Sequence, residues 1–491
     1  MVCGQFFRRE NMSEEISGNE YRQQRIENMK KLEEAGFPAF GKAFERTARL
    51  AELHADFELD KKVKACGRIV AIRKMGKMAF AHISDGSAKF QLMVKKDLLG
   101  DEKFAAFKLL DLGDFVGVEG ELFITRTEEE TIRVSDWTLL SKALLPLPEK
   151  FHGLTDVETR YRQRSLDLIS NPEVMEVFKK RTQILKEIRN FLDSRGYFEV
   201  ETPMMHQIAG GAAAKPFKAH YNALSTDVYM RIAPELYLKR LIVGGMDRVY
   251  EMNRNFRNEG LDRTHNPEFT ALEIYEAFGD MRTMQELIQS MFTHLAETVF
   301  GKMEFDWMGN TINLATPWRE VPYYDLIKEH LGDDWFEKNL DEARAKAEEL
   351  EVHIEEDMDF KQVTHEIYDK TIEGTLIQPT FITRLPKELV PLANHCADDP
   401  ELVDVFELII GGKEIAPAYS ELNNPIEQRK RFEEQAAGDG SKIDEDFLEA
   451  LEYGMPPTGG MGIGIDRLVM LLTGSDAIRD VILFPQLKPR T

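Results

Sequence analysis

Cysteines and long hydrophobic runs are both scarce in this sequence. Three cysteines occur among 491 residues, and none stands in a spacing typical of a disulfide framework or a zinc site. No apolar run approaches the ~20 residues that a membrane-spanning helix requires, and the N-terminal segment lacks the apolar core of a secretion signal. We therefore expect no membrane segment and a reducing compartment, most simply the cytoplasm. Met12 is an alternative candidate start, because residues 1–11 differ in character from everything downstream.

An excess of positive charge and the common phosphate-binding loops are missing as well. The formal net charge of -23 argues against a protein that coats nucleic acid indiscriminately. Residues 61–150 nevertheless hold 16 Lys and Arg against 13 Asp and Glu, a weak indication that this segment contacts a polyanion. No GxxxxGK[ST] loop occurs. The glycines at 459, 460, 462 and 464 do not have the dinucleotide-binding spacing.

Alternation and turn residues divide the first part of the chain. A chain of 491 residues is expected to form two or three domains. Residues 19–35 have the pattern of an amphipathic helix. Between residues 63 and 145 the sequence predicts five short strands with one helical stretch at 101–110, which favours a small closed barrel of the OB type. The prolines at 146 and 148 indicate a linker after it.

The remaining chain of about 340 residues mixes long helices with antiparallel strands. A long helix is predicted to begin at Pro172, because Asn171 is a candidate cap and proline suits the first helical position. Arg195 and Gly196 are predicted to end it. We therefore expect an α+β fold with the following parts: a helical extension at 1–60, the OB barrel at 61–148, and a larger domain at 149–491 that carries a charged helical insertion around 325–375.

Two adjacent predicted strands within residues 249–278 share an unusual polar face. By the two-residue period of a strand, the face includes Glu251, Asn253 and Arg257 on the first strand and Phe269 and Glu273 on the second. The opposite face is apolar. Because an unpaired buried charge costs roughly 3–5 kcal/mol when its partner is lost, such a face predicts a charged ligand.

Three segments resemble the signature motifs of class II aminoacyl-tRNA synthetases: FLDSRGYFEVETPMM at 191–205, FRNE at 256–259 and GMGIGIDRL at 460–468. Further segments are similar to the lysyl-tRNA synthetase family in particular: RYRQRSLDLI at 160–169, GGAAAKPF at 210–217, RIAPELYLKRLIVGG at 231–245 and SELN at 420–423. The resemblance covers nearly the whole chain. It implies an antiparallel catalytic sheet, a homodimer formed through residues 172–205, and ATP, L-lysine and tRNA(Lys) as substrates.

For the nucleotide, the resemblance implies that Arg257 contacts both the α-phosphate and the amino-acid carboxylate. An isolated Arg-x-Glu pair is more often a surface ion pair, but the shared polar face and the glycine-rich segment before Arg467 favour a nucleotide site. A guanidinium suits this task, because its planar fork binds oxyanions and stays charged. Arg257 and Arg467 would act in catalysis by stabilising charge. The implied ATP-binding residues are Arg257, Glu259, His265, Asn266, Phe269, Glu414 and Arg467.

For the amino acid, the resemblance implies a pocket lined by acids, as a cationic side chain requires. Glu235 would meet the α-ammonium, and Glu273 and Glu421 would meet the ε-ammonium. A neutral competitor would leave these carboxylates unpaired, a penalty that supports roughly 10⁴-fold discrimination without editing. The implied lysine-binding residues are Gly211, Glu235, Arg257, Glu273, Tyr275 and Glu421.

Isolated glutamates such as Glu407 and Glu414 are by default solvated edge charges. Beside a triphosphate they have the chemistry that Mg²⁺ prefers, namely one or two carboxylates with phosphate oxygens and waters. By resemblance, Mg²⁺ is the expected cofactor, and its candidate ligands are Glu407, Glu414 and Glu421.

In the predicted barrel, the resemblance implies that Arg73, Phe80, Gln91 and Glu129 contact the tRNA anticodon. Stacking on an aromatic side chain tolerates any base, so amide and carboxylate groups would supply the base preference. The alternative for Phe80 is a place in the barrel core. The KMGK segment at 74–77 looks like a class I synthetase loop, but it lies inside the barrel and has no HIGH partner.

The sequence departs from the family pattern at three positions. Pro417 stands where the family often has an asparagine, which puts one amide contact to lysine in doubt. Lys215 replaces a usual arginine, and Ser165 replaces a common tyrosine. Two rival functions remain. An aspartate or asparagine synthetase would need a cationic pocket, and a non-catalytic tRNA-binding paralogue would be expected to lose Arg257, Glu414 or Arg467.

Overall fold

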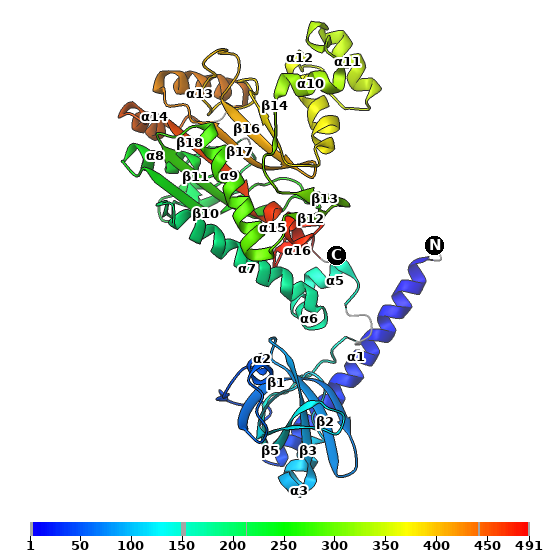
Figure 1. The fold of residues 1–491 in the computed structure, drawn as a ribbon. Coiled ribbons are helices and arrows are strands. Elements are labelled where there is room, and N and C mark those ends of the chain that lie inside the picture. The colour runs from blue at the N-terminus through cyan, green and yellow to red at the C-terminus, as the bar shows by residue number, and fades with distance from the viewer. Residues whose placement is uncertain (1–2, 149–153, 213, 440–441, 490–491) are drawn as a thin grey trace. The chain divides into compact units, whose positions relative to one another are not determined.

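The computed structural model describes residues 3–148, 154–212, 214–439 and 442–489. The chain forms two compact units, Met1–Leu154 and Thr155–Thr491, shown as ribbons in Figure 1. Within the described ranges, no helix is both long enough and apolar enough to cross a lipid bilayer.

The first unit is built around a closed barrel with the strand order β1-β2-β3-β5-β4, which confirms the predicted five-stranded barrel. Alternate side chains of β2, namely Ala79, Ala81 and Ile83, are buried inside it. The elements of this unit are α1 (Cys3–Glu34), α2 (Leu50–Ala55), β1 (Lys62–Lys74), β2 (Met78–Ser84), β3 (Lys89–Lys95), α3 (Lys96–Leu99), α4 (Asp101–Phe107), β4 (Phe115–Ile124) and β5 (Glu130–Ser141).

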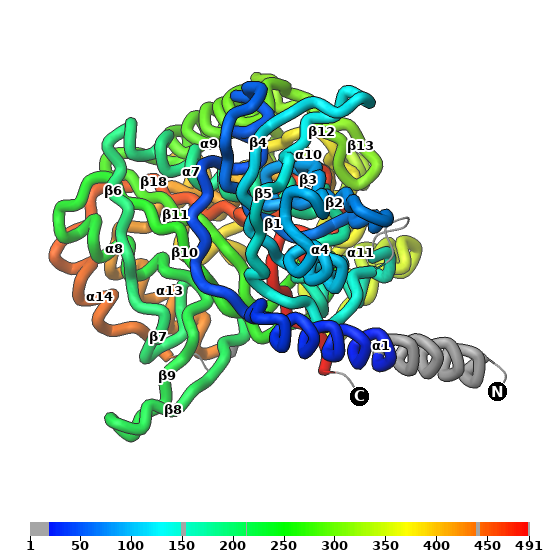
Figure 2. Tube along the Cα trace, turned by 90° about the horizontal axis from the view of Figure 1, so that it is seen from below, coloured from blue at the N-terminus to red at the C-terminus, as the bar shows by residue number. Residues whose placement is uncertain are grey.

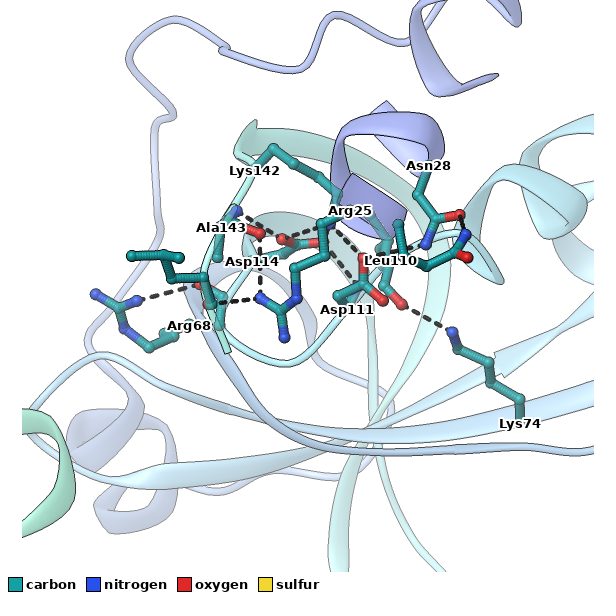
Figure 3. Close-up of polar contacts among 12 residues, drawn as sticks. Arg25, Asn28, Arg68, Lys74, Leu110, Asp111, Asp114, Lys142 and Ala143 are labelled. Carbon is teal, nitrogen blue, oxygen red and sulfur yellow. Dashed lines mark hydrogen bonds and ion pairs between the residues drawn. The ribbon is translucent and has the colours of Figure 1, made fainter. Parts of the chain in front are cut away.

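Helix α1 begins at Cys3, whereas the amphipathic pattern predicted a start at residue 19. A polar cluster joins this helix to the end of β5 (Figure 3). Arg25 donates hydrogen bonds to the carbonyl oxygens of Ala143 and Leu145, at 3.1 and 2.8 Å. The ammonium of Lys142 is fully buried and lies 2.9 Å from Asp114 and 2.6 Å from Asp111. The cluster therefore fixes the segment after β5 against the barrel.

The second unit contains an eight-stranded sheet in the order β14-β15-β16-β17-β18-β11-β10-β6, together with two small sheets. Its strands are β6 (Phe198–Glu199), β7 (Met205–His206), β8 (Lys218–Tyr221), β9 (Thr226–Met230), β10 (Arg248–Phe256), β11 (Glu268–Ala277), β12 (Glu304–Trp307), β13 (Asn310–Asn313), β14 (Arg319–Pro322), β15 (Thr380–Thr383), β16 (Val405–Ile410), β17 (Lys413–Ser420) and β18 (Thr458–Gly464). Figure 2 shows the β8–β9 hairpin projecting from the rest of this unit.

The helices of the second unit are α5 (Val157–Arg162), α6 (Arg164–Ser170), α7 (Pro172–Asp193), α8 (Glu235–Val243), α9 (Met281–Leu295), α10 (Tyr323–Leu331), α11 (Leu340–Glu349), α12 (Phe360–Ile367), α13 (Pro425–Asp439), α14 (Glu445–Glu452), α15 (Ile465–Thr473) and α16 (Ile478–Val481). Short π and 3-10 turns lie at Ala296–Phe300, Trp335–Glu337, Tyr368–Ile372 and Glu373–Thr375. Helix α7 begins at Pro172 as predicted, and Gly196 just beyond its end has φ +79°.

The main core lies on one face of the large sheet. Helices α7, α9 and α15 bury apolar side chains there against Leu272 and Ile274 of β11 and against Met461 and Ile463 of β18. The opposite face of the same strands carries Glu273, Tyr275 and Gly460. One face of the sheet therefore supplies the core, and the other is available for polar chemistry.

Helices α10, α11 and α12 lie in the region where the sequence predicted a helical insertion. Their apolar side chains pack together with strands β15 and β16, so they form a second core beside the edge of the sheet.

Candidate active site

The β10–β11 hairpin has the polar face that the sequence predicts. Glu251 lies opposite Glu273 in the strand register, and Asn255 lies opposite Phe269. Glu251 is buried, and its two carboxylate oxygens are occupied by Arg231 and Thr202, each at 2.7 Å. Both oxygens of Glu251 are therefore used in contacts within the protein, whereas the carboxylate of Glu273 on the same face remains available to a ligand.

Three carboxylates converge beyond this hairpin, and all three are buried: Glu235 at the start of α8, Glu273 on β11 and Glu421 directly after β17. Between two of them lies a lysine that the sequence analysis did not single out. The ammonium of Lys239 is 2.7 Å from Glu235 and 2.5 Å from Glu421, and its side chain is fully buried.

Tyr275 completes this acidic pocket. Its hydroxyl donates a hydrogen bond of 3.2 Å to Glu273. Burial and the nearby carboxylate of Glu235 raise the pKa of Glu273 well above its ordinary value. Burial also raises the pKa of Glu421 to about 8, since it outweighs the opposing effect of Lys239. Acids held in this way favour a cationic ligand, because bringing a positive charge close stabilises their ionised forms.

Glycines shape two walls of the acidic pocket. Gly211 has φ +86°, and a methyl group there would lie 3.3 Å from the Cβ of Glu235. A methyl group at Gly460 would lie 1.8 Å from Oε1 of Glu421 and 2.6 Å from the ring of Tyr275. The neighbouring Gly459 instead faces the backbone of Asp280, which is close packing of strand against helix. The glycine-rich segment therefore serves both the pocket and the core.

A cationic side chain follows the first strand of the hairpin. The guanidinium of Arg257 lies 5.1 Å from the centroid of the Phe269 ring. Its Nε atom is buried and has no hydrogen-bond partner among the residues that the structure describes. A buried donor without a partner is costly, so this atom indicates that an anionic ligand belongs here. Glu259 is exposed and accepts a hydrogen bond of 3.3 Å from the backbone of Lys215.

Arg467 brings together residues that are far apart in the sequence. It donates a hydrogen bond of 2.6 Å to the carbonyl oxygen of Glu414, and its other Nη atom lies 3.1 Å from Nε2 of His265. The side chain of Asn266 is already engaged, because it donates to the carbonyl of Glu268 and accepts from the backbone of Gln486. Asn266 therefore supports the loop, and its amide keeps a second N–H and a second lone pair for a ligand.

The candidate metal ligands Glu407 and Glu414 lie on the adjacent strands β16 and β17. Burial and the charges of Glu414 and Glu373 raise the pKa of Glu407 to about 8. Burial and Glu414 likewise raise the pKa of Glu373 to about 7, and the sequence analysis did not anticipate this third acid. A bound cation would relieve the repulsion among these three carboxylates, so this group of acids is suited to binding one. Among the described residues, no group of three or more His, Cys, Asp or Glu side chains is arranged to hold a metal ion.

The structure separates Glu421 from that pair. Glu421 follows Glu414 by seven residues along an extended strand, or roughly 23 Å at 3.3 Å per residue. Glu421 also forms an ion pair with Lys239, whereas Glu407 lies among other acids. The geometry therefore argues against the predicted role of Glu421 as a metal ligand and agrees with its place in the acidic pocket.

The predicted anticodon residues lie on one outer face of the barrel. Arg73 on β1 is opposite Phe80 on β2, which is in turn opposite Met93 on β3. Phe80 is half-buried and alternates with the buried Ala79 and Ala81, so it points away from the barrel interior.

A hydrogen-bonded group lies on the same barrel face. Gln91 donates a hydrogen bond of 2.5 Å to Glu129, and Glu129 lies 2.8 Å from Nε2 of His82. The sequence analysis missed His82, although its spacing of two residues from Phe80 on one strand could have indicated it. The structure thus brings Arg73, Phe80, Gln91 and Glu129 onto one face.

Comparison with known proteins gives two family matches and many full-length relatives. Residues 156–488 match the family of class II tRNA synthetases (D, K and N), and residues 63–140 match the OB-fold nucleic acid binding domain. The lysine–tRNA ligase of Carboxydothermus hydrogenoformans is 50% identical over 481 residues, which cover 96% of this chain and 99% of the relative. Those of Syntrophomonas wolfei and Enterococcus faecalis are also 50% identical, over 98% and 94% of this chain and over 99% and 96% of their own lengths. The chain therefore belongs to the class II tRNA synthetase family and, within it, to the lysine–tRNA ligases.

Proposed function

We propose that this chain activates L-lysine with ATP and transfers the lysyl group to the 3′ end of tRNA(Lys). The observation that carries the proposal is the pocket of buried carboxylates, Glu235, Glu273 and Glu421, together with Arg257, whose buried Nε atom has no hydrogen-bond partner among the described residues. Lysine is the amino acid that this arrangement fits, because it carries two ammonium groups and one carboxylate.

We assign each charge of lysine to a protein group of the pocket. Glu235 binds the α-ammonium, with the backbone at Gly211 beside it. Glu273 and Glu421 bind the ε-ammonium, and Tyr275 borders the aliphatic chain. Arg257 binds the carboxylate. Because the acids are buried, a substrate without the ε-ammonium would leave them unpaired, which gives discrimination of roughly 10⁴-fold.

ATP lies along the other end of the site. The adenine ring stacks on Phe269, and Glu259 accepts a hydrogen bond from its exocyclic amine. Arg257 contacts the α-phosphate, and Arg467 with His265 contacts the distal phosphates or the base. Arg467 already lies within hydrogen-bond distance of both Glu414 and His265, so the residues of this end are held near one another.

The reaction proceeds in two steps. An oxygen of the lysine carboxylate attacks the α-phosphorus of ATP, and the bond to the β-phosphate breaks to release pyrophosphate. The terminal ribose hydroxyl of tRNA then attacks the lysyl carbonyl, and AMP leaves. The chemistry requires no protein nucleophile, so Arg257 and Arg467 accelerate it by positioning the reactants and neutralising developing charge.

Glu407 and Glu414 would hold Mg²⁺ beside the phosphates. Their mutual repulsion, seen in the raised pKa of Glu407, supports a bound cation. When bound, the metal would neutralise charge on the phosphate oxygens.

The barrel would bind the anticodon of tRNA. Phe80 stacks on a base, while Arg73, Gln91 and Glu129 supply hydrogen bonds and charge. The outward orientation of Phe80 and its place beside Arg73 in the strand register support this role. We assign residues 61–148 to this anticodon-binding domain, 1–60 to an extension, and 149–491 to the catalytic domain with its insertion around 325–375.

We further propose a cytoplasmic homodimer. Phe198 and Met205 belong to the segment that the family uses for dimerisation, and their side chains are 62% and 59% exposed. Phe198 also lies on β6, which is an edge strand of the large sheet. An exposed apolar edge of this kind is typical of a subunit interface.

The family model that matches the chain also covers aspartate and asparagine enzymes, so the substrate needs its own argument. Those amino acids carry an anionic or neutral side chain. Glu273 and Glu421 would repel the first and would gain nothing from the second. The pocket therefore favours lysine among the three.

Amino-acid-dependent exchange of pyrophosphate into ATP tests this function. We expect strong exchange with lysine alone among the twenty amino acids, because only lysine pairs with all three carboxylates. Arg257→Ala should abolish exchange, because it removes the group that joins the carboxylate to the α-phosphate. Exchange with aspartate or asparagine in place of lysine would overturn the assignment.

A further inference from the structure

Lys239 has no part in the reaction proposed above, yet its ammonium lies inside the acidic pocket. It occupies the second turn of α8, four residues after Glu235, so both side chains lie on the same face of the helix. Its second partner, Glu421, comes from the far side of the pocket, after β17. One ammonium therefore connects two elements that each supply a substrate-binding acid.

The charges explain why a buried cation is needed there. The pocket holds three carboxylates, and free lysine brings two ammonium groups to them. Lys239 supplies the third positive charge, so acids and ammonium groups balance when lysine is bound. Without Lys239, one buried carboxylate would have no counter-charge, which is strongly unfavourable.

The ion pair is made by one oxygen of Glu421. The ammonium of Lys239 lies 2.5 Å from Oε2 of Glu421. Both carboxylate oxygens are buried, and neither has a hydrogen-bond partner among the described residues, so this carboxylate can still accept hydrogen bonds from a ligand. The Oε1 atom lies over Gly460, where no side chain intrudes. Lys239 thus restrains the carboxylate through Oε2, while Oε1 lies against Gly460 on the polar face of the sheet.

Lys239 is itself charged in this environment. Burial alone would lower its pKa, but the carboxylates of Glu235 and Glu421 raise it above its ordinary value.

We propose that Lys239 is a positioning residue that holds Glu235 and Glu421 at the spacing required by the two ammonium groups of the substrate. The inference rests on the proposed function, since it assigns a role within the same pocket. Lys239 sets the affinity for lysine through these two acids and leaves the nucleotide end of the site unchanged.

Pyrophosphate exchange by the full-length protein tests this role when the KM values for lysine and ATP are measured separately. Lys239→Met removes the ammonium but keeps an unbranched side chain. We expect the KM for lysine to rise by about tenfold or more, with the KM for ATP within about twofold of wild type and a smaller change in kcat. Lys239→Arg keeps the positive charge, so its KM for lysine should lie between those of wild type and Lys239→Met.

Lys142→Met is a matched control. Lys142 is also a fully buried lysine between two carboxylates, but it lies in the barrel unit. The same substitution there should leave both KM values for exchange unchanged. A thermal unfolding transition in each variant shows that it has folded.

The outcomes separate the two proposals. Absence of lysine-dependent exchange in the wild type would overturn the function itself. Wild-type exchange together with an unchanged KM for lysine in folded Lys239→Met, or equal rises in both KM values, would overturn only the role of Lys239. If Lys239→Met does not fold, Lys239→Arg tests the role of Lys239 instead. Its longer, planar cation should still raise the KM for lysine and leave the KM for ATP unchanged. An unchanged KM in that variant would contradict the proposal.

Discussion

At the scale of single residues, the absence of a side chain at Gly460 shapes the pocket as much as any charged group. A methyl group there would overlap Oε1 of Glu421 and press against the ring of Tyr275. Because the interior is closely packed, these groups could not both stay in place. Gly460 therefore permits the carboxylate of Glu421 and the ring of Tyr275 to lie against the strand.

Gly460→Ala should accordingly weaken lysine binding. We expect the KM for lysine in pyrophosphate exchange to rise by about tenfold or more, because Glu421 must turn away. Gly459→Ala provides the comparison, since its methyl group would meet the backbone of Asp280 at 2.6 Å. That variant should lose thermal stability without a selective change in the KM for lysine. Similar kinetic behaviour of the two variants would contradict this view of Gly460.

The residue scale is also where sequence reasoning reached its limit. Strand period placed Glu273 on the polar face of the hairpin, whereas Glu235 and Glu421 were named only through the family resemblance. Sequence reasoning did not find Lys239, since a lysine on a helix is normally exposed, and its burial depends on the approach of Glu421 from a distant strand. It assigned Asn266 to ATP and did not foresee that the same amide also fixes its own loop. Such partner choices depend on tertiary packing.

At the scale of elements, most of the predictions rested on the spacing of apolar residues and on turn and capping residues. The β10–β11 hairpin and the start of α7 follow from local pattern, and the structure confirms both. The start of α1 at Cys3 was not predicted, because the apolar pattern used for the prediction begins only at residue 19. The outer barrel face is likewise an element-scale feature, since it combines alternate residues of β1, β2 and β3.

Phe80→Ala tests the use of that barrel face. Loss of a stacked base should weaken tRNA binding by about 1–3 kcal/mol, and so raise the KM for tRNA in charging by roughly five- to a hundredfold. Pyrophosphate exchange, which needs no tRNA, should be unaffected. Phe115→Ala is a suitable control, because Phe115 lies on β4, which carries none of the four predicted anticodon residues, and its ring packs against Arg68. Equal losses of charging and exchange in Phe80→Ala would indicate a purely structural role.

At the scale of the whole molecule, charge is divided according to the task of each part. The net charge is -23, yet the segment that forms the barrel has a slight excess of basic residues. The acidic body holds a pocket for a cation, and the barrel segment avoids the repulsion that an acidic surface would exert on tRNA. Composition alone indicated this division. It could not indicate where the acids converge, because Glu235, Glu273 and Glu421 are joined only by the fold.

The central claim is that buried carboxylates await the ammonium groups of lysine, and calorimetric titration of the free protein with L-lysine tests it most directly. In the free protein the pKa of Glu421 is about 8, so below that pH its carboxyl group tends to hold a proton. An arriving ammonium lowers this pKa and expels the proton. At pH 7, in two buffers of different ionisation enthalpy, we expect lysine to bind with release of protons and with an affinity that rises from pH 6 to pH 8. Norleucine, which lacks the ε-ammonium, should show no binding at the same concentrations. Equal binding of norleucine, or lysine binding without proton release, would contradict the account.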